Sequence, residues 1–138
     1  MIVEKFKSTY QNMNASNIES IEGLYAEEIQ FTDPFHKIDG LGNLKQYFEE
    51  LYQNVESVEF EFGNSLNENK QFFIEWEMTV CHPKLNKAKP ILVPGGTLIK
   101  IDEFEKIIFH RDYFDAGAML YEQIPLLGRV IKWVKQKI

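Results

Sequence analysis

The stretch VESVEFEFGNSLNENKQFFIEWEMTV, residues 55–80, decides the fold class of this chain. Apolar side chains alternate with glutamates from Val58 to Phe62, and residues 72–80 repeat the alternation after the polar residues 64–69. Alternation of this kind is typical of a strand with one buried and one exposed face. The stretch therefore predicts two strands joined by a turn at residues 64–69.

Two further strands are expected on the C-terminal side. Residues 91–101 are rich in Ile, Leu and Val but contain Pro94-Gly95-Gly96, which predicts a bulge or a bend inside the strand. Residues 107–115 form the last expected strand, after a turn at residues 102–106. Together with residues 55–80, these segments predict an antiparallel meander.

The N-terminal part is expected to be mainly helical. Residues 2–13 carry apolar side chains at helical spacing, residues 16–26 form a second, short helix, and a third helix begins near Asn43. A strand at residues 28–32 stops at Asp33-Pro34, because proline lacks an N–H donor and favours extended geometry before it. Helices followed by a meander indicate an α+β fold, with a curved antiparallel sheet wrapped on N-terminal helices around an apolar cavity.

The length and composition describe one globular domain. The 138 residues fit a single domain spanning residues 1–138, with residues 117–138 as a C-terminal amphipathic helical tail. Apolar residues make up 44% and aromatic residues 14%, which excludes a disordered or fibrous chain. The net charge is −6 and no basic block is present, so nucleic acid is not an expected partner. The single cysteine, Cys81, and the lack of a signal-like or long apolar run favour the cytoplasm.

The histidines and glycines do not form a recognisable metal-binding or cofactor-binding motif. His36, His82 and His110 lack the ligand spacing of a zinc site, and no cysteine cluster accompanies them. Gly95-Gly96 lacks the lysine and the following helix of a phosphate-binding loop. We therefore expect no metal and no other cofactor.

Alternation divides the last strand into two sets of side chains. If Asp115 faces the cavity, Arg111 and Tyr113 face it as well; the alternative is a salt bridge between Asp115 and Arg111 at the strand end. Burial would raise the pKa of such a carboxyl group and a nearby Arg would lower it. One set consists of Phe109, Arg111, Tyr113 and Asp115, and the other of Ile108, His110, Asp112 and Phe114.

Asp33, His36 and Trp76 are further candidates for the cavity. Asp33 precedes Pro34, where a carboxylate commonly accepts backbone N–H bonds of a turn, so it serves either the turn or proton transfer. Histidine is the residue type most suited to proton transfer near neutral pH, and His36 is either solvated or available to assist such a transfer. Trp76 lies on an apolar strand face that forms either ordinary core or a pocket wall.

Residues 126–138 form a basic amphipathic pattern in which apolar residues alternate with Arg129, Lys132, Lys135 and Lys137. Such a helix packs on its own domain, docks on a second subunit, or lies on a membrane surface. We expect one of the packed forms, because a short helix with four cations binds membranes weakly.

Two motifs carry a resemblance to a known superfamily. The first runs from Asn14-Ala15 to LYAEEIQFTDP at residues 24–34, and the second is FHRDYFDAGAMLYEQIPLLG at residues 109–128. On these motifs the chain resembles, over residues 3–127, the superfamily of nuclear transport factor 2, ketosteroid isomerase and the SnoaL-type polyketide cyclases. The resemblance implies a cone-shaped fold, a homodimer formed through the outer face of the sheet, and a small apolar ligand.

The resemblance also implies roles for two aspartates. Asp33 matches the proton-shuttling base of the isomerases, and Asp115 matches the general acid/base of the cyclases. We therefore expect proton transfer on an apolar carbonyl or polyketide-like substrate, with Arg111 or Tyr113 stabilising the developing oxyanion. The side chains expected to bind the ligand are His36, Trp76 and Phe109.

Some positions depart from the patterns of the enzymes in this superfamily. Thr9 and Gly96 stand where the isomerases carry the Tyr and Asp of their oxyanion hole. Glu75-Trp76-Glu77 stands where limonene epoxide hydrolases, which share the ending with Asp115, carry an Arg-x-Asp pair. These departures keep open an alternative, a non-catalytic ligand-binding or scaffold module of the same fold.

Overall fold

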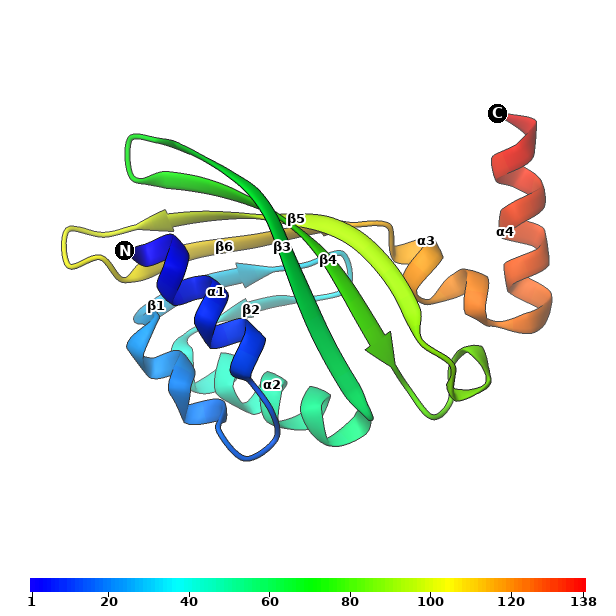
Figure 1. Ribbon diagram of the computed structural model, residues 1–138, viewed down its shortest axis with the longest axis horizontal. Coiled ribbons are helices and arrows are strands. Elements are labelled where there is room, and N and C mark those ends of the chain that lie inside the picture. The colour runs from blue at the N-terminus through cyan, green and yellow to red at the C-terminus, as the bar shows by residue number, and fades with distance from the viewer.

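A computed structural model describes residues 1–138 and shows a six-stranded curved sheet with helices against it (Figure 1). The strand order is β2-β1-β6-β5-β4-β3; β1 and β6 are parallel, and the other neighbours are antiparallel. This mixed sheet confirms the predicted α+β fold. The strands are β1 (Tyr25–Thr32), β2 (Lys37–Asp39), β3 (Ser57–Glu68), β4 (Gln71–Cys81), β5 (Ile91–Ile101) and β6 (Ile107–Phe114).

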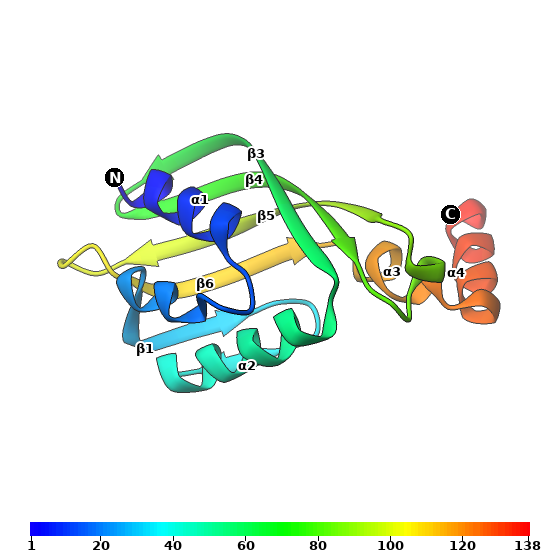
Figure 2. The ribbon, with the colours of Figure 1, turned by 60° about the horizontal axis from the view of Figure 1, so that its bottom comes forward.

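The N-terminal helices lie against the concave face of the sheet (Figure 2). Helical spacing brings Phe6 and Tyr10 to one side of the first helix and Leu44 and Phe48 to one side of the third, and all four are buried. They share one hydrophobic core with residues of the sheet such as Ile74. The helical segments are α1 (Ile2–Asn12), η1 (Ile18–Gly23), α2 (Leu41–Asn54), η2 (Asn86–Ala88), α3 (Ala116–Met119), η3 (Tyr121–Gln123) and α4 (Pro125–Lys137).

Two N-terminal elements differ from the prediction. The short helix expected at residues 16–26 is the 3₁₀ helix η1, and β1 already begins at Tyr25. Ile18, Ile21 and Leu24 are buried at a spacing of three, which suits the three residues per turn of a 3₁₀ helix. The three-residue strand β2, which pairs with β1, was not predicted because so short a segment has no readable alternation.

The turn between β3 and β4 lies later than predicted. Residues 64–68 belong to β3, and the chain reverses at Asn69 and Lys70, whose φ angles are 50° and 63°. Two adjacent residues with positive φ are characteristic of a tight hairpin turn whose twist matches that of the strands. The polar composition of residues 64–68 reflects exposure of this end of the hairpin rather than a loop.

The glycines of β5 make room for aromatic side chains. The pairing of β5 with β4 continues through Gly95 and Gly96 without a register shift, so the strand curves here and the alternative of a bulge is wrong (Figure 1). A Cβ added to Gly95 would lie 2.5 Å from Cη2 of Trp76, and one added to Gly96 would overlap the ring of Phe73. The two glycines therefore let the aromatic rings of β4 lie against the backbone of β5.

The C-terminal tail is helical, as predicted, but it does not pack its apolar side on the domain. After α3 and η3, helix α4 stands apart from the sheet at the end of the molecule (Figures 1 and 2). Its apolar residues, including Leu126 and Trp133, are exposed. The apolar side of α4 therefore does not pack on its own domain, and packing on a second subunit stays a prediction. None of the helices combines the length and apolar composition needed to cross a membrane.

Candidate active site

An aromatic cavity of about 150 Å³ lies between the concave face of the sheet and α2. A cavity of this size accommodates a molecule about as large as benzene. Most of its wall is apolar, and its polar groups come from α1, the end of β1, α2, β4 and β6, together with His82 just after β4. The aromatic residues of the wall are Tyr10, Phe31, Phe35, Tyr47, Phe48, Tyr52, Phe60, Trp76 and Phe114.

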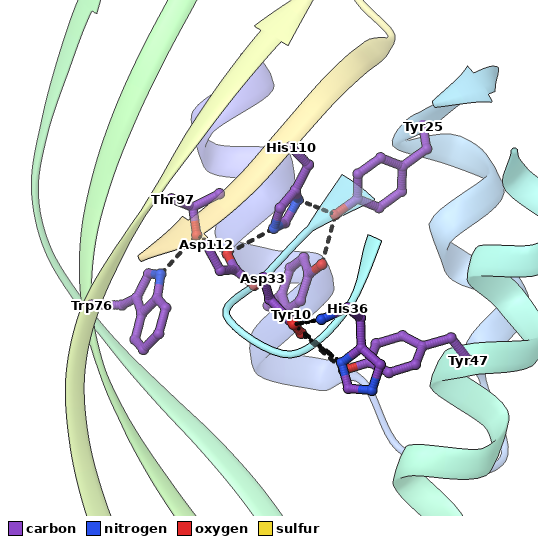
Figure 3. Close-up of polar contacts among 9 residues, drawn as sticks. All are labelled: Tyr10, Tyr25, Asp33, His36, Tyr47, Trp76, Thr97, His110 and Asp112. Atoms are coloured by element: carbon purple, nitrogen blue, oxygen red, sulfur yellow. Dashed lines mark hydrogen bonds and ion pairs between the residues drawn. The ribbon is translucent and has the colours of Figure 1, made fainter. Parts of the chain in front are cut away.

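Asp112 on β6 presents a carboxylate to this cavity (Figure 3). Its Oδ1 accepts hydrogen bonds from Thr97 Oγ1 at 2.6 Å and from His110 Nε2 at 2.7 Å. Its Oδ2 makes no hydrogen bond within the protein, and the side chain keeps 19% of its surface exposed. One oxygen is thus held in place and the other is free to meet a ligand.

A buried chain of hydrogen bonds orients His110 behind this carboxylate (Figure 3). His110 Nδ1 lies 2.8 Å from the Tyr25 hydroxyl, which lies 2.6 Å from the Tyr10 hydroxyl. Burial raises the pKa of both tyrosines well above the usual value, so both hydroxyls remain protonated.

The direction of this chain follows from the available acceptors. If Tyr10 donates to Tyr25 and Tyr25 donates to Nδ1, the neutral His110 donates from Nε2 to Asp112, and every group is paired. The reverse direction would leave the buried Tyr10 hydroxyl without an acceptor. We therefore assign His110 as neutral, with its proton on Nε2.

A second chain reaches the same carboxylate oxygen from β4. The indole Nε1 of Trp76 donates to Thr97 Oγ1 at 2.8 Å, and Thr97 in turn donates to Asp112. Trp76 also lines the cavity, as the sequence predicted for it. Side chains from β4, β5 and β6 are thus connected by hydrogen bonds to this one oxygen, and these bonds fix the position of Asp112.

Asp33 lies on the cavity wall and also holds its own turn together. Its Oδ1 accepts the backbone N–H groups of Phe35 at 2.8 Å and His36 at 2.7 Å, and its Oδ2 accepts the Tyr47 hydroxyl at 3.1 Å. The side chain is only 6% exposed. Asp33 therefore stabilises the turn and also lies on the cavity wall. Its role in proton transfer stays a prediction.

His36 lies at the edge of the cavity, beside Asp33. Its Nδ1 is 3.1 Å from Asp33 Oδ1, and its ring lies 4.7 Å from the ring of Tyr47. With 44% of its side chain exposed, His36 connects the cavity wall with solvent.

Tyr52 supplies the other polar group of the wall that has no partner. Its hydroxyl makes no hydrogen bond within the protein, and burial raises its pKa to about 12. The hydroxyl therefore remains a hydrogen-bond donor throughout the neutral range.

The structure places four predicted site residues outside the cavity. Asp115 caps α3, where it accepts the Ala118 N–H at 3.1 Å and binds Lys135 Nζ at 2.8 Å, and this lysine lowers the pKa of Asp115. The expectation that Asp115 faces the cavity is therefore wrong. Its set on β6 faces away as well: the Arg111 guanidinium lies 5.0 Å from the Tyr113 ring, and Lys100 Nζ lies 4.8 Å from the Phe109 ring.

The correct side of β6 could have been identified from Arg111. An arginine without a buried acid as partner normally lies outside, which would have assigned Asp112 and Phe114 to the cavity and His110 to the core behind it. Anchoring the alternation on Asp115, which lies just beyond the strand, reversed this assignment.

Solved structures share this fold at low sequence identity. A protein with a ketosteroid isomerase-like fold from Catenulispora acidiphila, in complex with trimethylamine, has a TM-score of 0.75 at 17% identity, covering 91% of this chain and 92% of the other. A proposed SnoaL-like polyketide cyclase from Shewanella denitrificans gives 0.75 at 15% identity, with 90% and 94% covered. TerC, co-crystallised with polyporic acid, gives 0.74 at 12% identity, with 90% and 98% covered.

The sequence itself gives the family. None of the curated proteins matches it. The sequence profile of the SnoaL-like domain matches residues 6–110, which is more than half of the chain. Together with the cone-shaped fold, this match confirms the resemblance seen in the two sequence motifs. The chain belongs to the SnoaL-like domain family.

Proposed function

We propose that this protein is a small-molecule enzyme of the isomerase or cyclase type that moves a proton on a small, largely apolar carbonyl or polyketide-like substrate. One observation carries the proposal: Asp112 offers a free Oδ2 to an aromatic cavity while two donors hold its Oδ1. A carboxylate fixed in this way is suited to act as a general base. Solved structures described as an isomerase of the SnoaL-like family and as SnoaL-like polyketide cyclases support the reaction class.

In the proposed reaction Asp112 takes a proton from the carbon next to the substrate carbonyl. The electrons of the C–H bond move towards the carbonyl oxygen and form an enolate. In a β,γ-unsaturated carbonyl substrate, return of the proton from Asp112 to the γ-carbon of the resulting dienolate completes an isomerisation. In a substrate with a second carbonyl, the enolate carbon attacks that carbonyl carbon, its C=O π electrons move to the oxygen, and the proton on Asp112 passes to the resulting alkoxide, which completes a cyclisation. The Tyr52 hydroxyl is the donor we propose for the developing oxyanion, in place of Arg111 or Tyr113.

Asp33 and His36 remain candidates for a second proton-transfer step. Asp33 holds His36 through Nδ1 at the edge of the cavity. The imidazole can therefore exchange protons with solvent while its orientation is kept. We propose His36 as the group that returns or removes protons from the substrate oxygen.

Ligand binding without turnover is the second candidate function. Asp33 and Asp112 bring two carboxylates to a wall of aromatic rings that includes no Lys or Arg. Such a wall attracts a ligand with a cationic nitrogen through both charge and ring faces. The trimethylamine complex of the Catenulispora acidiphila protein is consistent with this candidate.

The test uses acetophenone in deuterated water and follows exchange of the protons next to its carbonyl by NMR. We expect Asp112→Asn to slow exchange by roughly 100-fold or more, the usual contribution of a general base. Asp115→Asn makes the same chemical change outside the cavity and is expected to leave the rate unchanged.

Other outcomes separate the two candidates. Equal exchange by the wild type and Asp112→Asn would overturn the assignment of Asp112 as the base. Trimethylammonium binding that exceeds binding of the similarly sized, neutral tert-butanol, with no exchange of acetophenone protons, would favour ligand binding alone.

Two further properties accompany the proposal. We propose a cytoplasmic location, because Cys81 has no second cysteine to pair with. We also propose the homodimer implied by the superfamily, formed through the outer face of the sheet, where Leu92 and Tyr113 are exposed.

A further inference from the structure

Helix α4 is attached to the domain by its polar side. Lys135 Nζ lies 2.8 Å from Asp115 Oδ2 and 2.9 Å from Glu122 Oε2. On the same side Gly128 is buried, and a Cβ added there would overlap the backbone of Glu122. Contacts of this kind fix which side of the helix faces the domain.

The opposite side of α4 is apolar and exposed. Leu126 keeps 75% and Trp133 keeps 60% of its surface exposed. Helical spacing places these residues on one stripe, and their exposure shows that the stripe is not covered by the domain. The helix itself lies at the end of the molecule (Figure 2). A water-exposed stripe of this length indicates a surface that is covered in use. Its members are Leu126, Leu127, Val130, Trp133, Val134 and Ile138.

Positive charge is concentrated in this helix. Residues 125–138 contain Arg129, Lys132, Lys135 and Lys137 and no acidic residue, although the whole chain carries a net charge of −6. Only Lys135 has an ion-pair partner. Arg129 lies beside the apolar stripe and Lys137 lies along it, next to Trp133, whereas Lys132 lies on the side nearer the domain. None of these three cations has an ion-pair partner.

We propose that α4 binds the surface of an anionic lipid membrane, lying in the interface with its apolar stripe among the acyl chains. The stripe and the cations match the two chemistries of that surface, acyl chains and lipid phosphates. Trp133, with the ammonium group of Lys137 5.5 Å from its ring, is a residue type that favours the boundary between them.

A second copy of the chain fits this helix less well. Pairing α4 with its own copy would bring two cationic helices together. The outer face of β3 and β4 carries the opposite charge through Glu59, Glu61, Glu75 and Glu77. Its apolar side chains Leu66 and Phe73 line only a hollow shared with polar residues of the hairpin, which is a poor match for a stripe of six apolar residues. The membrane surface supplies both the charge and the apolar phase.

The position of α4 has a consequence for the cavity. Met119, at the end of α3, lines the cavity, and Tyr121 packs on Phe35 of the cavity wall with ring centroids 6.1 Å apart. Helix α4 begins four residues after Tyr121. Binding through α4 therefore holds the cavity beside the lipid surface, whether or not the cavity is catalytic.

The test is sedimentation of the full chain with lipid vesicles. We expect binding to vesicles of phosphatidylcholine mixed with phosphatidylglycerol, and much weaker binding to pure phosphatidylcholine or at high salt. Replacing Arg129 and Lys137 by Gln should weaken binding by about fivefold for each cation. The double variant Val130→Asp/Trp133→Asp should abolish binding, because it places charges in the stripe.

A matched variant controls for the loss of exposed apolar residues elsewhere. Leu66→Asp/Phe104→Asp changes one aliphatic and one aromatic residue that are also exposed, and it should bind vesicles like the wild type. Absence of binding to the anionic vesicles at low salt would overturn the proposal, as would equal binding by Val130→Asp/Trp133→Asp. A dimer that this variant disrupts, without vesicle binding by the wild type, would assign the stripe to a second copy instead.

Discussion

At the scale of single residues, the position of Asp112 depends on residues far from it in sequence. His110 is its neighbour on β6, but Thr97 lies on β5, and Tyr25 and Tyr10 belong to β1 and α1. All of these groups are buried or nearly so, and none is left unpaired. A buried network of this kind is costly to interrupt, because each removed group leaves a partner without a hydrogen bond.

The variant Tyr25→Phe tests this network. It removes one hydroxyl, so that Tyr10 loses its acceptor and His110 Nδ1 loses its donor while the ring still fills its space. We expect the free energy of unfolding to fall by about 1–3 kcal/mol, the cost of leaving buried polar groups unpaired. Urea denaturation measures the change.

Tyr113→Phe is the control: it removes a hydroxyl from an exposed tyrosine and should change the free energy of unfolding by less than about 0.5 kcal/mol. Equal effects of the two variants would contradict the network.

At the scale of elements, the predictions succeeded where the local pattern was long. The alternation from Val58 to Phe62 and from Phe72 to Val80 identified β3 and β4, because each strand has one covered and one exposed face. The three residues of β2 contain too little pattern to read, and η1 has the spacing of a short helix with a different hydrogen-bond pattern. Alternation also fixes two faces without stating which is inside, and the resemblance to the cyclases pointed to Asp115 rather than to Asp112.

The candidate site shows the same difference. Residues placed by local sequence patterns could be predicted, whereas contacts between residues far apart in the sequence could not. Asp33, His36 and Trp76 could be predicted because turn chemistry and strand pattern place them. The partners of Asp112 could not, because the contact between Tyr25 and His110 joins residues that are 85 positions apart. Contacts of this length depend on the pairing of β1 with β6, which leaves no periodic trace in the sequence.

The junction between α3 and α4 should respond to acid. Lys135 and the Ala118 N–H lower the pKa of Asp115 below its usual 3.8. The bonds of Asp115 therefore contribute fully above pH 3.8 and are lost only as the pH falls through the lowered value. An NMR titration of the Ala118 amide should show a midpoint below the ordinary aspartate range, and Asp115→Asn should remove this transition. A midpoint at the ordinary value would contradict the contact with Lys135.

At the scale of the whole molecule, the two faces of the sheet differ because buried and exposed side chains alternate along the strands. In β4 the residues from Ile74 to Val80 are buried at every second position and exposed or half-buried at the others. The inner set lines the core and the cavity, whereas the outer set has no helix to bury it. Helix α4 lies at one end and presents a third, separate surface. The molecule thus divides its possible interactions among a cavity, a sheet face and a helix.

The outer sheet face is the surface we expect to form the homodimer. Leu92 on β5 and Tyr113 on β6 are large apolar residues exposed on this face. Analytical ultracentrifugation of the wild type should give twice the chain mass of 16.2 kDa, and Leu92→Glu/Tyr113→Glu should give a monomer, because it places charges in the contact.

The other exposed surfaces provide the controls for this dimer. Phe104→Glu, in the turn between β5 and β6, introduces the same charge away from the sheet face and should leave the mass unchanged. Val130→Asp/Trp133→Asp in α4 should also leave it unchanged, since the helix surface and the sheet face serve different partners. A monomeric wild type, or a dimer that survives Leu92→Glu/Tyr113→Glu, would show that the outer face does not form the contact.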